Sequence, residues 1–281
     1  MSGERLHIFT GKGGVGKTSM AMAYTLFLKQ KNQNVFYINF NEENNLSVID
    51  ELGLPTLALN IVSSAENYIE RKLHSKIIAK FVMQAPFFKA LFNIVPSLGS
   101  MIMLGHILKQ LEEDPSMVLV LDAPASGHSL SMFESSHQFQ TIFRKGIIVD
   151  DIENMHRYLY DSNFCKIFII STVSRLSLEE AQELKQEMQN RFHNIDSIYN
   201  FSYLKFIEKI NESHRENSTK LNIPNLPSFL REKINFESEL FYSLKVQDHH
   251  IFSLSISNRF VDRVHDLFQH FQLHFNASDE I

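Results

Sequence analysis

Short apolar runs alternate with longer stretches of helical composition along the 281 residues of the chain. Helical stretches include residues 17–30 and SLEEAQELKQEMQNRF at 177–192. Alternation of this kind predicts an α/β fold, a mostly parallel sheet flanked by helices on both faces. The apolar runs that are typical of buried strands lie at residues 5–10, 34–40, 116–122, 165–171, 196–201 and 250–256.

Residues 60–112 interrupt this alternation, because one helical stretch follows another with no strand between them. Phe and Met are frequent here, and Pro86 and Pro96 are predicted to separate the helices. We therefore expect a single domain over residues 1–281 that carries an inserted helical subdomain at 60–112.

Composition narrows the class of protein. The formal net charge of -5 argues against nonspecific binding to nucleic acid, which needs clustered Lys and Arg. The chain shows no apolar run as long as a signal peptide or a membrane span requires. The simplest expectation is a cytoplasmic protein.

A glycine-rich stretch, FTGKGGVGKTSM at residues 9–20, follows the first predicted strand and opens the first predicted helix. It fits the P-loop pattern Gly-x-x-x-x-Gly-Lys-Thr in the context that this pattern requires. The glycines let backbone N–H groups turn toward phosphate oxygens, Lys17 neutralises phosphate charge, and Thr18 is a ligand for Mg²⁺. The predicted contacts with ATP or ADP are Gly11, Lys12, Gly13, Gly14, Val15, Gly16, Lys17, Thr18 and Ser19.

The apolar strand VLVLD at residues 118–122 ends in an aspartate. A carboxylate at the end of such a strand is typical of the Walker B position, where it holds Mg²⁺, usually through water. Thr18 and Asp122 are therefore the predicted metal-binding residues.

The loop GKGGVGKT resembles the deviant Walker A motif of a group of dimeric ATPases. This group includes the arsenite-pump subunit, the tail-anchored-protein targeting ATPases and the MinD/ParA positioning proteins. The segment APASGH after Asp122 is similar to switch II of the ArsA-like branch in particular. The resemblance extends through QAPFFKALFNIVPSLGSMIMLGHILKQL, as in short bacterial members, and covers most of residues 5–200.

The resemblance implies roles for three residues. In that group the early lysine of the loop reaches across a dimer interface, so Lys12 is expected to act on the nucleotide of a partner subunit, as an arginine finger does. Gly127 is expected near the γ-phosphate. Asn200 matches a strand-end asparagine that reads adenine in the family, and an ordinary cap of the strand end is the alternative. The implied partner is a second copy of this chain or a paralogous ATPase.

Two departures from the family pattern limit what the resemblance implies. The family carries an aspartate in switch I that orients the attacking water, and Asn41 stands at this position. An amide does not accept a proton from water as a carboxylate does, so hydrolysis is expected to be slow unless Glu42 takes over. The cysteines that bind arsenite or zinc in family members are absent, since Cys165 is the one cysteine of the chain.

The Phe- and Met-rich residues 81–108 have two open interpretations. Flexible thioethers and aromatic rings suit an adaptable groove for an apolar helix of a client protein. They equally suit packing of the subdomain on itself and across a dimer. The C-terminal stretch SNRFVDRVHDLFQHFQLHF has a broad apolar face, which we expect to pack against the sheet rather than to bind a membrane.

The sequence thus predicts an ATP-hydrolysing dimeric switch in which the nucleotide controls the helical subdomain. The alternative is a partner subunit that binds nucleotide but hydrolyses it poorly, which Asn41 favours. A small-molecule or nucleotide kinase is a weaker alternative, because Lys12 and the match to switch II would then be coincidences.

Overall fold

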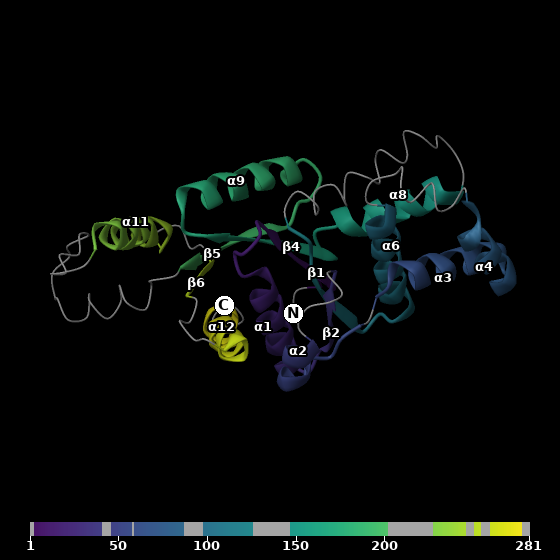
Figure 1. Cartoon of the computed structure of the whole chain (residues 1–281), viewed down its shortest axis with the longest axis horizontal. Helices are drawn as coiled ribbons and strands as arrows, with labels where there is room; N and C mark the ends of the chain where they lie inside the picture. The colour runs from purple at the N-terminus through teal and green to yellow at the C-terminus, as the bar shows by residue number, and fades with distance from the viewer. Residues whose placement is uncertain are drawn as a thin grey trace.

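The fold is built on one parallel sheet with the strand order β2-β3-β1-β4-β5-β6, as Figure 1 shows. The computed structural model describes residues 3–40, 46–57, 59–86, 98–125, 147–201, 227–245, 250–253 and 259–276. All six predicted strands are present, and every pairing between them is parallel, so the predicted α/β fold is confirmed. The strands are β1 (Leu6–Gly11), β2 (Asn34–Asn39), β3 (Met117–Asp122), β4 (Cys165–Thr172), β5 (Ile195–Phe201) and β6 (His250–Ser253).

Helices cover both faces of this sheet (Figure 1). One face carries α1 (Lys17–Gln30), α2 (Leu46–Leu52) and α12 (Phe260–Asn276), and the other carries α6 (Leu98–Glu113), α8 (Ile147–Tyr160) and α9 (Arg175–Gln189). The remaining described helices are α3 (Ile61–Leu73), α4 (Lys76–Gln84) and α11 (Ser228–Lys245). None of the helices in the described ranges combines the length and the apolar character that crossing a membrane needs.

The two faces follow from the alternation of side chains along the strands. On β1, Leu6 and Ile8 join the hydrophobic core beneath α6, α8 and α9. Phe9 joins the core on the opposite face, where it stacks on Phe168 with ring centroids 4.8 Å apart. Because both faces are covered, the central strands are apolar at nearly every position, as parallel sheets require.

The C-terminal helix α12 packs against α1 and β6, as the apolar face of its sequence predicts. Val264, Leu267 and Phe271 are fully buried in the same core as Phe252 of β6. The apolar face of this helix is therefore used for packing inside the molecule.

The region at 60–112 contains α3, α4 and α6. Leu104 and Ile107 of α6 are fully buried against the sheet, and Met101 and Met103 of the same helix also lie in this core. Helix α3 contacts α4 and α6, and α6 in turn contacts β3 of the sheet (Figure 1). In contrast, Phe81 of α4 is 73% exposed.

The end of β1 makes a close backbone contact with β4 at Gly11, which pairs with Ile170. Gly11 has φ +143, and a Cβ atom at this position would lie 2.2 Å from the Ile170 carbonyl oxygen. Only glycine satisfies both conditions, because the left-handed region and the contact each exclude a side chain. The first glycine of the loop is therefore required by the sheet.

We predict that Gly11→Ala lowers the unfolding temperature by at least about 5 °C, since it adds a steric clash and backbone strain of roughly 2 kcal/mol or more. Gly13→Ala is the matched control, because a Cβ at Gly13 meets no described atom within 4 Å. Thermal denaturation followed by circular dichroism measures both. Equal unfolding temperatures for the two variants would contradict the prediction.

Candidate nucleotide-binding site

The glycine-rich loop lies at the carboxyl ends of the central strands, between β1 and the start of α1. Phe9 pairs with Asp122 on β3, and Gly11 pairs with Ile170 on β4. In turn, Thr172 at the end of β4 pairs with Asn200 on β5. The parallel registers therefore gather the ends of four strands around one loop, the edge at which open α/β sheets bind ligands.

Helix α1 begins at this loop with a terminus suited to an anion. Its N-cap residue Gly16 is left-handed, with φ 97°, and provides no capping side chain, and the first turn holds no acidic residue. The backbone N–H groups of this turn and the positive end of the helix dipole therefore have no negative group on the helix to compensate them. A phosphate group would supply one.

Lys17 folds back over the loop. Its Nζ atom donates a hydrogen bond to the carbonyl oxygen of Lys12 at 2.9 Å. Burial lowers the pKa of Lys17, and the negative charge of Asp122 opposes this shift. The ammonium group is thus already positioned on the loop, in a half-buried environment where its charge is poorly screened.

Asp122 lies beside the first turn of α1. Its Oδ2 atom accepts hydrogen bonds from Thr18 Oγ1 at 2.6 Å and from the Tyr37 hydroxyl at 3.2 Å. Burial raises the pKa of Asp122 to about 6, although the bonds from Thr18 and Tyr37 and the charge of Lys17 act in the opposite direction. The other carboxylate oxygen, Oδ1, is buried and has no hydrogen-bond partner within the described part of the chain.

These residues fit a magnesium ion that is bound together with phosphate. Thr18 and Asp122 offer a hydroxyl and a carboxylate, the oxygen ligands that Mg²⁺ prefers. The Oδ1 atom of Asp122, which has no hydrogen-bond partner among the described residues, is available to bind the ion directly or through water. The described residues contain no cluster of three or more His, Cys, Asp or Glu side chains that would form a metal site of protein ligands alone. Mg²⁺ is commonly held by one or two protein groups plus water and substrate phosphates, which matches this arrangement.

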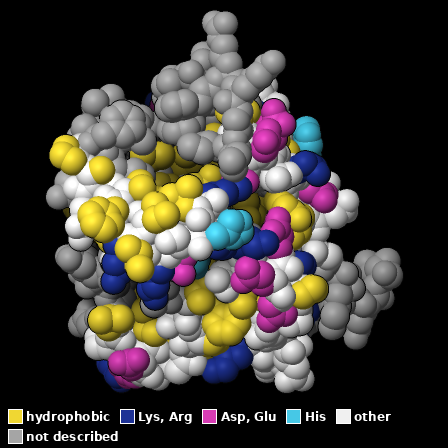
Figure 2. Space-filling model, turned by 90° about the vertical axis from the view of Figure 1, so that its right-hand side faces the viewer, with side chains coloured by type: hydrophobic (Ala, Val, Ile, Leu, Met, Phe, Trp, Pro, Cys, Tyr) yellow, Lys and Arg dark blue, Asp and Glu magenta, His cyan; other side chains and the backbone are white. Residues whose placement is uncertain are grey.

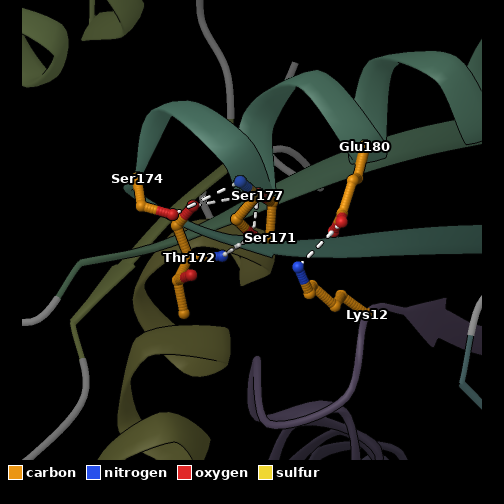
Figure 3. Close-up of polar contacts among 6 residues, drawn as sticks. All are labelled: Lys12, Ser171, Thr172, Ser174, Ser177 and Glu180. Atoms are coloured by element: carbon orange, nitrogen blue, oxygen red, sulfur yellow. Dashed lines mark hydrogen bonds and ion pairs between the residues drawn. The ribbon is translucent and has the colours of Figure 1, made fainter.

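Lys12 extends from the loop toward Glu180 on helix α9 (Figure 3). Its Nζ atom forms an ion pair with Glu180 Oε1 at 2.7 Å, and the two side chains are 41% and 35% exposed. The second carboxylate oxygen of Glu180 is buried without a hydrogen-bond partner among the described residues. The two lysines of the loop therefore occupy different environments.

Glu180 is positioned by a polar array at the start of α9 (Figure 3). Ser174 caps the helix by accepting from the backbone N–H of Ser177, and Ser177 Oγ accepts from the N–H of Thr172 at 3.2 Å. Ser177 Oγ also lies 3.1 Å from Ser171 Oγ. Because these bonds tie the first turn of α9 to the end of β4, Glu180 one turn later is held above the loop.

Asn200 lies beneath the loop and is fully buried. Its Nδ2 atom donates a hydrogen bond to the Val15 carbonyl oxygen at 2.9 Å, and a Cβ atom on Gly16 would approach Nδ2 to 2.8 Å. The predicted contact of Asn200 with adenine stays a prediction.

The other predicted contacts are distributed as follows. Ser19 is buried in the first turn of α1, and a Cβ atom on Gly13 or on Gly14, which has φ +81, would meet no described atom within 4 Å. Asn41, Glu42 and Gly127 lie outside the described residues.

Sequence reasoning missed Glu180 and Tyr37. Glu180 is one of several acidic residues on α9, and nothing in the sequence distinguishes it from the others. Tyr37 carried a detectable signal, since the inward positions of β2 are otherwise apolar and a tyrosine there needs a partner for its hydroxyl.

The parallel sheet, the glycine-rich loop and the strand-end aspartate define a P-loop NTPase fold. A model of the anion-transporting ATPase family (ArsA ATPase) matches residues 4–149, which are 146 of the 281 residues. The chain therefore belongs to this family.

The chain is also similar to curated proteins that are named as ATPases. The chain is 22% identical over 211 residues to ATPase BagA of Mycobacterium tuberculosis and to "Putative ATPase Mb3704" of Mycobacterium bovis. Each alignment covers 67% of this chain and 62% of the relative. The chain thus spans less than two thirds of the length of these relatives.

We predict that Lys17→Ala weakens the binding of Mg·ATP roughly ten- to hundredfold, because it removes a charge-assisted hydrogen bond to phosphate. Lys29→Ala is the matched control, since Lys29 is exposed at the far end of the same helix and bonds to the Gly53 carbonyl. Isothermal titration calorimetry measures both affinities. Wild-type affinity in Lys17→Ala would overturn the assignment of the loop as the phosphate site.

Proposed function

We propose that this protein is an ATP-hydrolysing switch that dimerises around bound nucleotide and whose nucleotide state controls its helical region. The single observation that carries the proposal is the 2.6 Å hydrogen bond from Thr18 to Asp122, because it joins the phosphate loop to the Walker B carboxylate. Membership of the anion-transporting ATPase family supports the same activity.

Each residue of the site has a task toward the substrate. Lys17 and the N–H groups at the start of α1 bind the phosphates, and Tyr37 and Thr18 orient the Asp122 carboxylate. Mg²⁺, when bound, would neutralise charge on the β- and γ-phosphates. The buried position of Asp122 excludes water from this side of the phosphates, which strengthens each electrostatic contact.

Hydrolysis also needs a group that orients the attacking water. The resemblance puts Asn41 at this position, and Phe40, the residue before it, is anchored beside the site because its N–H group donates to the Asp122 carbonyl at 3.3 Å. An amide is a weak substitute for a carboxylate in this role. A second candidate function is therefore a subunit that binds nucleotide and hydrolyses it poorly, and Asn41 is the observation that favours it.

Lys12 is proposed to act across the dimer. Lys17 already serves the loop of its own chain, whereas the Lys12 side chain is 41% exposed and held by a carboxylate at the rim. For Lys12 to reach a partner's nucleotide, it must exchange Glu180 for phosphate. This exchange becomes favourable where two approaching surfaces exclude water, because phosphate carries more charge than one carboxylate.

The helical region is proposed to bind a client or partner protein. Figure 2 shows hydrophobic side chains exposed at the end of the molecule where Figure 1 places α3 and α4. On these helices Ile77 is 72% and Val62 is 60% exposed, in addition to Phe81. An apolar helix of another protein suits such a surface, as in helix-in-groove recognition.

We predict slow turnover by the wild type and a faster rate for Asn41→Asp, since a water-orienting carboxylate typically contributes ~10²–10⁴-fold. The measurement is steady-state ATP hydrolysis with and without Mg²⁺, with Lys17→Ala as the inactive control. An unchanged rate in Asn41→Asp, together with loss of activity in Glu42→Gln, would assign the role to Glu42.

We also predict opposite effects of two substitutions on ATP-dependent dimerisation. Lys12→Ala should weaken the dimer at least about tenfold while the monomer still binds nucleotide, because the ammonium is lost only from the partner's site. Glu180→Gln should strengthen the dimer about two- to fivefold, because an exposed ion pair that competes with phosphate is removed. Analytical ultracentrifugation measures both.

Glu183→Gln is the matched control, since it changes the same charge on an exposed position of α9. If Lys12→Ala dimerises with ATP like the wild type, or if it loses nucleotide binding as a monomer, the lysine does not act in trans. A mixed dimer of a Lys12→Ala chain and a Lys17→Ala chain separates the two cases. One of its two sites is complete if Lys12 acts in trans, and neither site is complete if Lys12 acts in cis.

A further inference from the structure

The buried side chain of Asn200 makes an unusual contact between β5 and the phosphate loop. Its strand pairs with β4 on one side and β6 on the other, and the residue has no exposed surface. A buried amide is unfavourable unless it is hydrogen-bonded, and a buried strand usually carries an apolar residue at such a position. The described partner of this amide is the Val15 carbonyl, 185 residues away in sequence.

The contact orients the peptide group between Val15 and Gly16. Every described peptide bond is trans, so the carbonyl of Val15 and the N–H of Gly16 point in opposite directions. Because Asn200 Nδ2 holds the carbonyl at 2.9 Å, the Gly16 N–H is directed away from Asn200. Gly16 immediately precedes Lys17, so this N–H belongs to the group of donors at the start of α1.

The size of Gly16 supports this role of Asn200. A Cβ atom on Gly16 would lie 2.8 Å from Asn200 Nδ2, so the asparagine fills the space behind the loop. The φ of +97 at residue 16 favours glycine, and a Cβ atom there would also force the Asn200 amide to shift. The loop and Asn200 fit together as one unit.

We propose that Asn200 is a positioning residue of the phosphate site, which acts by holding the Val15–Gly16 peptide with its N–H turned toward the bound phosphates. This inference rests on the proposed binding of nucleotide at the loop. Under this proposal Asn200 contributes to the binding of the phosphates, whereas a contact with adenine would make it contribute to the binding of the base.

The test compares two ligands, Mg·ATP and Mg·tripolyphosphate, which shares the phosphates and lacks the base. Without Asn200 the Val15 carbonyl loses its donor, so Asn200→Ala should weaken the binding of both ligands by about tenfold or more. Asn200→Asp should weaken both further, because it replaces the donor by an oxygen that faces the Val15 carbonyl. Isothermal titration calorimetry gives the affinities.

Ile198→Val is the matched control, since Ile198 is fully buried on the same strand and has no part in the loop. This variant should lose stability and keep wild-type affinity for both ligands. Asn200→Ser keeps a neutral polar side chain in the buried position and replaces Asn200→Ala if the latter does not fold.

An unchanged affinity of the Asn200 variants for tripolyphosphate, with weaker binding of ATP, would overturn the proposal and show a contact with the base. Unchanged affinity for both ligands would also overturn it. A wild type that binds neither ligand would instead refute the proposed nucleotide site, so the two failures are distinguishable.

Discussion

Strand β1 is paired on both edges, with β3 on one side and β4 on the other, and the candidate site depends on this double pairing. The register with β3 places Asp122 beside Phe9, and the register with β4 places the Ile170 carbonyl against Gly11. A shift of either register by one residue would turn the strand's side chains to the opposite face and separate the loop from the aspartate. The apolar cores on both faces hold these registers in place, because Leu6 and Ile8 are buried in one of them and Phe9 in the other.

The two lysines of the loop differ because of burial. Lys17 lies over the loop of its own chain, in a half-buried environment where the charge of Asp122 influences it. Lys12 extends to the rim and pairs with Glu180 on a surface that remains accessible. Charges near the rim are screened by solvent until another surface covers them. This difference in exposure is the basis for the proposed role of Lys12 in a dimer.

The site combines residues from both halves of the chain. The match to the family model ends at residue 149, and within it lie the loop and Asp122. Glu180 and Asn200 follow later in the chain and reach the loop from α9 and β5. The polar array of Ser171, Ser174 and Ser177 connects α9 to the end of β4. Two residues from the second half of the chain therefore contact the loop, one from α9 and one from β5.

The sequence by itself determined the six strands, the parallel sheet and the loop with Lys17, Thr18 and Asp122. These features are encoded locally, since apolar periodicity marks the strands and one eight-residue motif supplies most of the phosphate site. The tertiary structure decided the contacts of Tyr37, Glu180 and Asn200. Their partners are 85, 168 and 185 residues distant, and only the order and register of parallel strands bring them together. The sequence indicates that a tyrosine in a buried strand needs a partner, but it does not identify that partner for the tyrosine, the glutamate or the asparagine, because these hydrogen bonds form only across the finished sheet.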